Sequence, residues 1–91
     1  MKKVFAQVFV KPESVATFKS IVPFLIKKTR EEKGCLAYNL FEQTENPGLF
    51  VFVEEYLNQE ALDYHFSSPY LAEFGRQMDG LQTKEMIVDI I

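Results

Sequence analysis

A single histidine stands out among the residues of this 91-residue chain that could carry chemistry. His65 lies in the segment 59–66, whose apolar residues recur at helical spacing, so its imidazole is predicted to face a sheet. An imidazole with its ordinary pKa of ~6.5 can act as a general base near neutral pH. The alternative is a core histidine bonded to a backbone carbonyl, and position alone favours that ordinary role.

Residues on two predicted neighbouring strands could work with this imidazole. Glu54 shares one face of its strand with Tyr56, and burying a bare carboxylate is costly. Glu54 therefore either orients His65 or binds a substrate, or else it lies at a solvated strand end. Tyr38 places a hydroxyl on an otherwise apolar face, where tyrosine is more often part of the core than a ligand contact.

Other catalytic arrangements are missing from the sequence. One His, one Cys and scattered carboxylates give no spacing typical of a transition-metal site. No glycine-rich loop follows a strand, so neither a dinucleotide fingerprint nor a phosphate-binding loop is present. Cys35 has no basic neighbour to lower its pKa and is predicted to be inert. We therefore expect neither a metal nor another cofactor.

Charge and hydropathy exclude two classes of partner. The net charge is −3, and no basic stripe suits a nucleic-acid backbone. The one basic cluster, Lys27, Lys28 and Arg30, is followed by Glu31 and Glu32, which indicates a solvated helix face. No apolar run approaches the ~20 residues of a membrane span, and no signal peptide is visible. A cytoplasmic location is the expectation.

The elements predicted from periodicity and turn residues alternate between strands and helices. Asn58 is expected to cap one helix, Ser68 and Pro69 to begin the next, and Gly34 to end the first helix in a left-handed conformation. The predicted strands are 3–11, 35–43, 49–57 and 85–91, and the predicted helices are 12–33, 59–66 and 69–79. This β-α-β-β-α-β order, with the second helix broken near Ser67, predicts one α+β domain over residues 1–91, with a ferredoxin-like four-stranded antiparallel sheet.

Both faces of this predicted sheet are apolar. In the second strand Leu36 and Tyr38 are expected on one face, with Cys35 and Ala37 on the other. Two helices can cover only one face of the sheet, so the other would expose a large apolar patch. A homodimer that packs sheet against sheet is therefore expected.

Three segments of the chain together resemble the antibiotic biosynthesis monooxygenase family. That family's pattern includes a Gly-Cys-x-x-Tyr strand start, a Glu-x-aromatic strand end, and Glu-Ala-x-x-x-His followed by Ser/Thr-Pro. The matching segments are 32–38 (EKGCLAY), 52–56 (FVEEY) and 60–70 (EALDYHFSSPY). The element order extends the resemblance over essentially the whole chain.

The resemblance implies a dimeric α/β-barrel type of protein with a pocket between sheet and helices. Family members include monooxygenases that oxidise quinols or phenolic compounds without flavin, haem or metal. Carried over to this chain, His65 would be the base, Tyr38 would bond the substrate oxygen, and Glu54 would orient the imidazole. Three further aromatic residues, Tyr56, Tyr70 and Phe74, are expected to contact a small aromatic substrate.

Two positions depart from the family pattern, and alternatives remain open. Tyr70 stands where many relatives carry a second histidine, and Tyr56 stands where many carry tryptophan. The missing tryptophan counts against the haem-degrading relatives. Besides a cofactor-free monooxygenase, the resemblance allows an isomerase of a small sugar-derived signal, although no basic group for a phosphate is evident. A non-catalytic dimeric binding or stress-related domain is the third reading.

Overall fold

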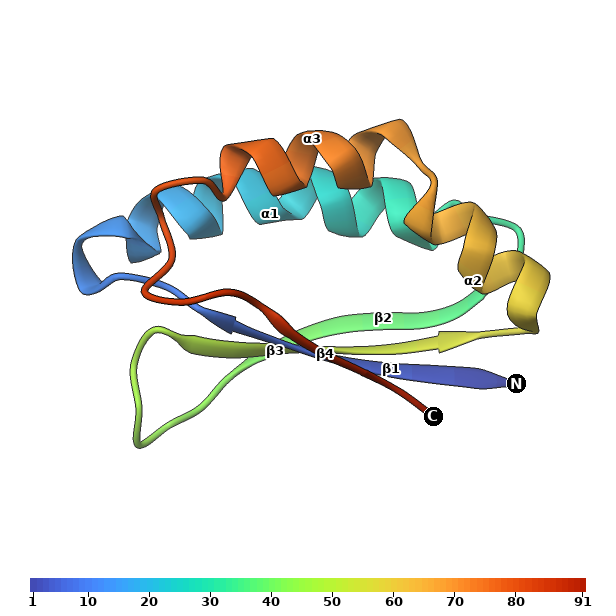
Figure 1. The fold of residues 1–91 in the computed structure, drawn as a ribbon, viewed down its shortest axis with the longest axis horizontal. Helices are drawn as coiled ribbons and strands as arrows, with labels where there is room; N and C mark the ends of the chain where they lie inside the picture. Colours follow the sequence, from blue (N-terminus) through green and yellow to red (C-terminus); the bar gives the residue numbers. More distant parts are fainter.

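A computed structural model describes all residues, 1–91, and shows a sheet covered on one face by helices (Figure 1). The elements follow in the order expected from the sequence, with a short 3-10 turn over Pro12–Ser14 before the first helix. The strands are β1 (Lys2–Phe9), β2 (Cys35–Glu42), β3 (Leu49–Tyr56) and β4 (Ile87–Ile90), and the helices are α1 (Val15–Arg30), α2 (Gln59–Phe66) and α3 (Pro69–Gln77).

The four strands pair antiparallel in the order β2-β3-β1-β4. All three helices lie on the same side of this sheet (Figure 1). The arrangement is the ferredoxin-like α+β fold, so the predicted fold class is confirmed. The break between α2 and α3 at Ser67 and Ser68 also lies where the sequence indicated it.

The core fills the space between the helices and the covered face of the sheet. Every second residue of β3 is buried, beginning with Phe50 and ending with Tyr56, as the strand period requires. Phe18 of α1 contacts Phe50 with ring centroids 4.6 Å apart, and Phe74 of α3 lies 6.4 Å from Phe18. Phe74, expected to contact substrate, thus lies in this core cluster.

The start of β2 differs from the predicted alternation because it contains a β-bulge. The pairing with β3 shifts register between Cys35 and Ala37, which inserts one extra residue at Leu36. Leu36 is therefore exposed, while Cys35 packs against the core on the side that Tyr38 also faces. The prediction that Leu36 shares a face with Tyr38 was wrong.

Gly34 has a role other than the predicted left-handed helix end. Helix α1 ends at Arg30, and only Gly48 and Gly80 have positive φ. A Cβ built at Gly34 would lie 2.3 Å from the Cβ of Ala61 in α2. Glycine is needed here because α2 packs directly against the loop that leads into β2.

Replacing Gly34 with alanine is expected to lower the free energy of unfolding by about 2 kcal/mol, as overpacking does elsewhere. Urea denaturation followed by circular dichroism measures this change. Gly75→Ala is the matched control: no atom lies within 4 Å of its added methyl, and alanine favours the helix by about 0.5–1 kcal/mol. Adding Ala61→Gly to Gly34→Ala should restore part of the loss, and no restoration would refute the steric explanation.

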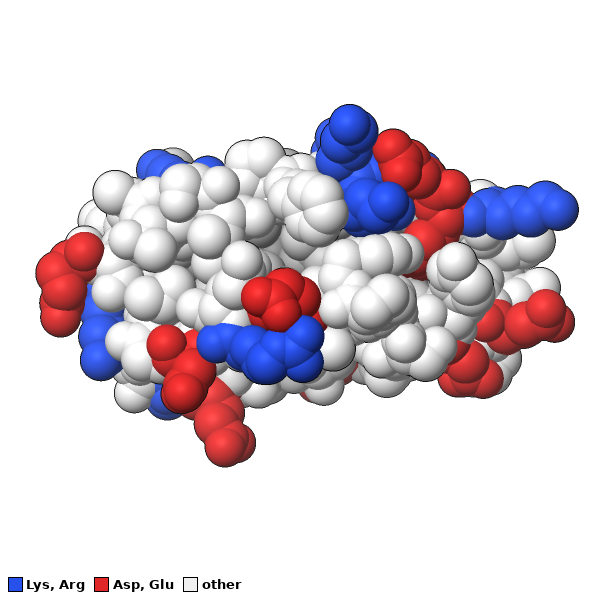
Figure 2. Space-filling view, turned by 90° about the horizontal axis from the view of Figure 1, so that it is seen from above, with Lys and Arg blue, Asp and Glu red and all other residues white.

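The face of the sheet opposite the helices carries no covering element (Figure 1). Its apolar side chains include Phe5, Phe41, Val51, Val53 and Ile87, of which Phe41 is 54% exposed. The helical side, by contrast, mixes acidic and basic residues without a continuous basic stripe (Figure 2). None of the helices has the length and hydropathy needed to cross a bilayer.

Candidate functional site

His65 lies on the inner side of α2 and is almost completely buried, with 1% of its surface exposed. Its ring contacts two tyrosines of the sheet, with centroids 5.2 Å from Tyr56 and 5.5 Å from Tyr38. Two bonds fix the end of α2, because the Ser68 hydroxyl and backbone N–H both donate to the His65 carbonyl, at 2.7 and 3.1 Å. These bonds fix the backbone of His65 at the end of α2, while the two tyrosine rings pack against its imidazole.

Glu32 is the closest polar partner of this imidazole. Its Oε2 lies 2.9 Å from His65 Nδ1, and the Tyr70 hydroxyl donates to the same oxygen. Only 3% of the Glu32 side chain is exposed, so its predicted place on a solvated helix face was wrong. The side chain turns inward because the chain bends after Arg30, just where α1 ends.

Glu54 and Tyr56 lie on the other side of the imidazole. The Tyr56 hydroxyl donates to Glu54 Oε1 at 2.7 Å, and that oxygen lies 3.8 Å from His65 Nε2, beyond hydrogen-bond distance. Glu54 is 4% exposed, which rules out the alternative of a solvated strand end. Of the two carboxylates, Glu32 rather than Glu54 is thus in position to orient the ring.

Burial sets the protonation states within this cluster. Desolvation raises the pKa of Glu54 to about 7, opposed by the Tyr56 hydrogen bond and reinforced by the charge of Glu32. Desolvation also lowers the pKa of His65, while the hydrogen bond and charge of Glu32 act in the opposite direction. At neutral pH the imidazole is uncharged, with Nδ1–H donating to Glu32, which leaves the Nε2 lone pair free.

The predicted site residues therefore separate into two groups. His65, Tyr38, Glu54 and Tyr56 lie together on the covered face of the sheet, and Tyr70 joins them through Glu32. Burial raises the pKa of Tyr38 and of Tyr56, so both phenols remain protonated donors. Phe74 packs instead against Phe18 and Phe52.

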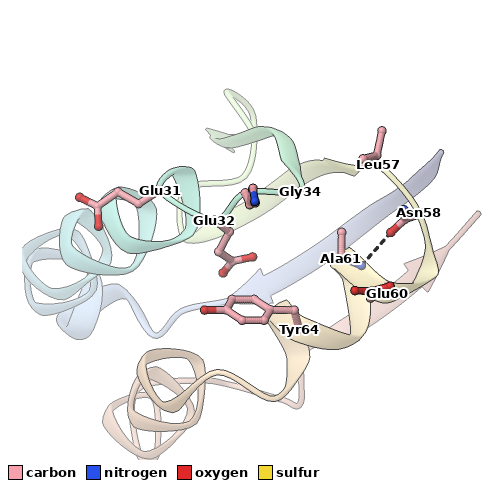
Figure 3. Close-up of a pocket in the computed structure, with 9 residues that line it drawn as sticks. Glu31, Glu32, Gly34, Leu57, Asn58, Glu60, Ala61 and Tyr64 are labelled. Carbon is pink, nitrogen blue, oxygen red and sulfur yellow. Dashed lines mark hydrogen bonds between the residues drawn. The ribbon is translucent and has the colours of Figure 1, made fainter.

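A groove of about 650 Å³ lies beside this cluster, between the end of α1 and the outer side of α2 (Figure 3). Its walls include Glu32, Gly34, Ala61 and Tyr64, with the Glu32 carboxylate directed between Gly34 and Tyr64. His65 does not line it, nor does it line the two smaller hollows beside β2 and α1. The imidazole is thus buried beside the groove rather than exposed in it, and Glu32 lies between the imidazole and the groove.

Neither a metal site nor a reactive thiol lies near this cluster. No group of three or more His, Cys, Asp or Glu side chains is arranged to hold a metal ion. Burial raises the pKa of the Cys35 thiol to about 11, which keeps it protonated at neutral pH. The groups able to exchange a proton here are the Glu32–His65 pair and Glu54.

Glu32 is the functional candidate that sequence reasoning missed. The buried stripe of α1 runs through Val22, Leu25 and Thr29, and continuing its spacing by three residues reaches Glu32. That spacing is the signal that could have placed Glu32 inside rather than in the charged last turn.

Comparison with known proteins gives consistent results. The model of the antibiotic biosynthesis monooxygenase family matches residues 1–77. Rv0793 of Mycobacterium tuberculosis, which is provisionally named a monooxygenase, is 30% identical over 97% of this chain and 86% of its own length. The uncharacterised protein sll1783 of Synechocystis is 35% identical, but the matched region covers 55% of its length, so the chain spans about half of that relative.

Solved structures show the same similarity. A crystal structure of an antibiotic biosynthesis monooxygenase is 36% identical with a TM-score of 0.94, and the match covers 100% of this chain and 96% of that one. A conserved protein from Methanosarcina mazei is 31% identical with a TM-score of 0.94, over 99% of this chain and 89% of that one.

Proposed function

The chain belongs to the antibiotic biosynthesis monooxygenase family, and from this membership we propose that it is a cofactor-independent monooxygenase that oxidises a small quinol or phenol with dioxygen. The observation that carries the proposal is the buried contact of 2.9 Å between His65 Nδ1 and Glu32 Oε2. A carboxylate that holds an uncharged imidazole makes a base, and such a base is what the activation of a phenol requires.

The chemistry needs only this base and a substrate that supplies the electrons. Loss of the phenolic proton to the Glu32–His65 pair gives an electron-rich phenolate, which can pass one electron to dioxygen. Combination of the resulting radicals and uptake of a proton give a hydroperoxide. If the reacting carbon is a methylene group, loss of water then leaves a carbonyl. One oxygen atom enters the product, the other leaves as water, and the substrate provides all four electrons.

Consumption of oxygen tests this proposal directly. With a panel of hydroquinones and phenols that contain an activated methylene group, the protein is expected to consume one dioxygen per substrate oxidised, and to do so after dialysis against a chelator. With ¹⁸O₂, one labelled atom should appear in the product. Rates no faster than in buffer across the whole panel would refute the proposed oxidation.

We also propose that the chain forms a homodimer through the open face of its sheet. The apolar side chains on that face are spread over all four strands, and exposed apolar surface of this kind is covered by a partner in many proteins. Light scattering at micromolar concentration is expected to give the mass of two chains rather than 10.6 kDa. Phe41→Glu should shift the mass toward one chain, whereas Phe24→Glu, on the exposed side of α1, should not. A monomeric wild type would refute the dimer.

A further inference from the structure

The groove beside α2 contains a polar atom that the fold leaves without a partner. Glu32 Oε2 accepts hydrogen bonds from His65 and Tyr70, but Glu32 Oε1 is buried and accepts none from the protein. A buried acceptor without a donor costs free energy, because the fold has removed its hydrogen bonds to water. A ligand that supplies a donor at this point recovers that free energy.

The charge of the groove restricts which ligands can use this acceptor. Glu31, Glu32 and Glu60 contribute carboxylates to its walls, and Lys33 is the only cationic residue there. This excess of negative charge repels an anionic ligand and favours an uncharged or cationic one. Leu57 and Ala61 add apolar wall, and the volume of about 650 Å³ is typical of a small-molecule site.

We propose that this groove is the substrate site, and that it binds an uncharged or cationic phenol whose hydroxyl donates a hydrogen bond to Glu32 Oε1. The identity of the ligand as a phenol rests on the proposed oxidation. Glu32 then touches the substrate on one oxygen and His65 on the other. Deprotonation breaks the substrate O–H bond, and the proton passes to Oε1 of the pair.

Tyr64 lines the same groove as Glu32. Its ring lies beside the Glu32 carboxylate in the groove (Figure 3), and 62% of its surface is exposed. Because Oε1 is buried, a phenol reaches it only if side chains of the groove wall move, and the mostly solvated Tyr64 ring loses little packing when it rotates. The same ring is then able to stack on a bound aromatic substrate.

Binding of three naphthols that differ in charge tests the proposal without turnover. Under exclusion of oxygen, 2-naphthol, 6-(aminomethyl)-2-naphthol and 6-hydroxy-2-naphthoate are titrated into ¹⁵N-labelled protein. We expect the first two to shift the amide signals of Gly34 and Ala61, and to bind about tenfold more tightly than the carboxylate. Best binding by the carboxylate, shifts away from the groove, or no binding of any probe would overturn the proposal.

Variants then test the two carboxylates of the groove, Glu32 for its hydrogen bond to the phenol and Glu60 for its negative charge. Glu32→Gln is expected to weaken 2-naphthol binding about tenfold, because hydrogen bonds to a charged acceptor are stronger. Glu60→Lys, at the exposed rim, should bring the affinities of the carboxylate and the amine together. Glu45→Lys makes the same charge change in the turn before β3 and should alter nothing. Equal effects of Glu60→Lys and Glu45→Lys would contradict the role of the groove.

The two proposals fail in different ways. Binding of 2-naphthol in the groove without consumption of oxygen by any substrate would refute the oxidation and leave the binding site in place. Oxidation of a phenol whose KM is unchanged by both Glu32→Gln and Glu60→Lys would refute the site and leave the oxidation in place.

Discussion

Replacing Glu32 with glutamine is expected to lower kcat for phenol oxidation by about 10²- to 10⁴-fold, the usual contribution of general base catalysis. The glutamine oxygen can still accept the hydrogen bonds that His65 Nδ1–H and the Tyr70 hydroxyl donate to Glu32 Oε2. The amide cannot take up a proton near neutral pH. The variant thus keeps the hydrogen bonds that the fold provides and removes only the group that accepts the substrate proton.

Measurement of kcat and the thermal midpoint together separates chemistry from folding. Glu32→Gln should melt within a few degrees of the wild type, whereas Glu32→Ala leaves His65 Nδ1–H without its buried acceptor and should melt earlier. Asp63→Ala, an exposed change on α2, should leave kcat unchanged. If Glu32→Gln oxidises phenols at the wild-type rate, Glu32 and its partner His65 have only a structural role.

The fold could be predicted from the sequence because its signals are local and mutually consistent. Buried and exposed residues alternate along β3, the buried face of α1 repeats at helical spacing, and Asn58 accepts the hydrogen bond that caps α2. The strands could therefore be placed before their partners were known. Two local details could not be predicted in this way. The bulge at Leu36 depends on the register with β3, and the tight contact at Gly34 depends on Ala61 of α2.

The candidate site was predicted only in part, for a related physical reason. His65, Tyr38 and Glu54 lie on regular elements, so period alone indicated that they face inward. Glu32 lies two residues beyond the end of α1, so the spacing of the buried stripe reaches it, but the helix itself no longer fixes the direction of its side chain. Its neighbours in sequence are charged and exposed, which concealed that its own side chain is buried. Only the packing of α2 against this loop identifies it as the partner of His65.

Replacing Glu54 with glutamine is expected to stabilise the protein in alkaline solution, by up to about 3 kcal/mol at pH 8.5. Burial raises the pKa of Glu54 from 4.5 to about 7, so between these values the folded protein holds a proton that the unfolded chain has released. The stability that the protonated carboxyl contributes is complete below pH 4.5 and is lost as the pH rises through about 7. The Glu54→Gln variant does not lose this stability, because the glutamine side chain carries no charge at any of these pH values.

The glutamine side chain of the Glu54→Gln variant can keep the hydrogen bond that Glu54 makes with Tyr56. Its oxygen can accept from the Tyr56 hydroxyl as Glu54 Oε1 does. Urea denaturation from pH 4.5 to 8.5 should therefore give a stability difference, variant minus wild type, that is near zero at pH 4.5 and increases with pH.

His65 does not disturb this comparison. Its pKa is lowered by burial, so it contributes stability above pH 6.5 that is lost as the pH falls through its folded pKa, in both proteins alike. Glu55→Gln, the next residue on the open face of β3, removes the same charge from outside the cluster and serves as the control. A stability difference that stays constant from pH 4.5 to 8.5 would mean that Glu54 is ionised throughout this range, which would contradict the raised pKa of its carboxyl.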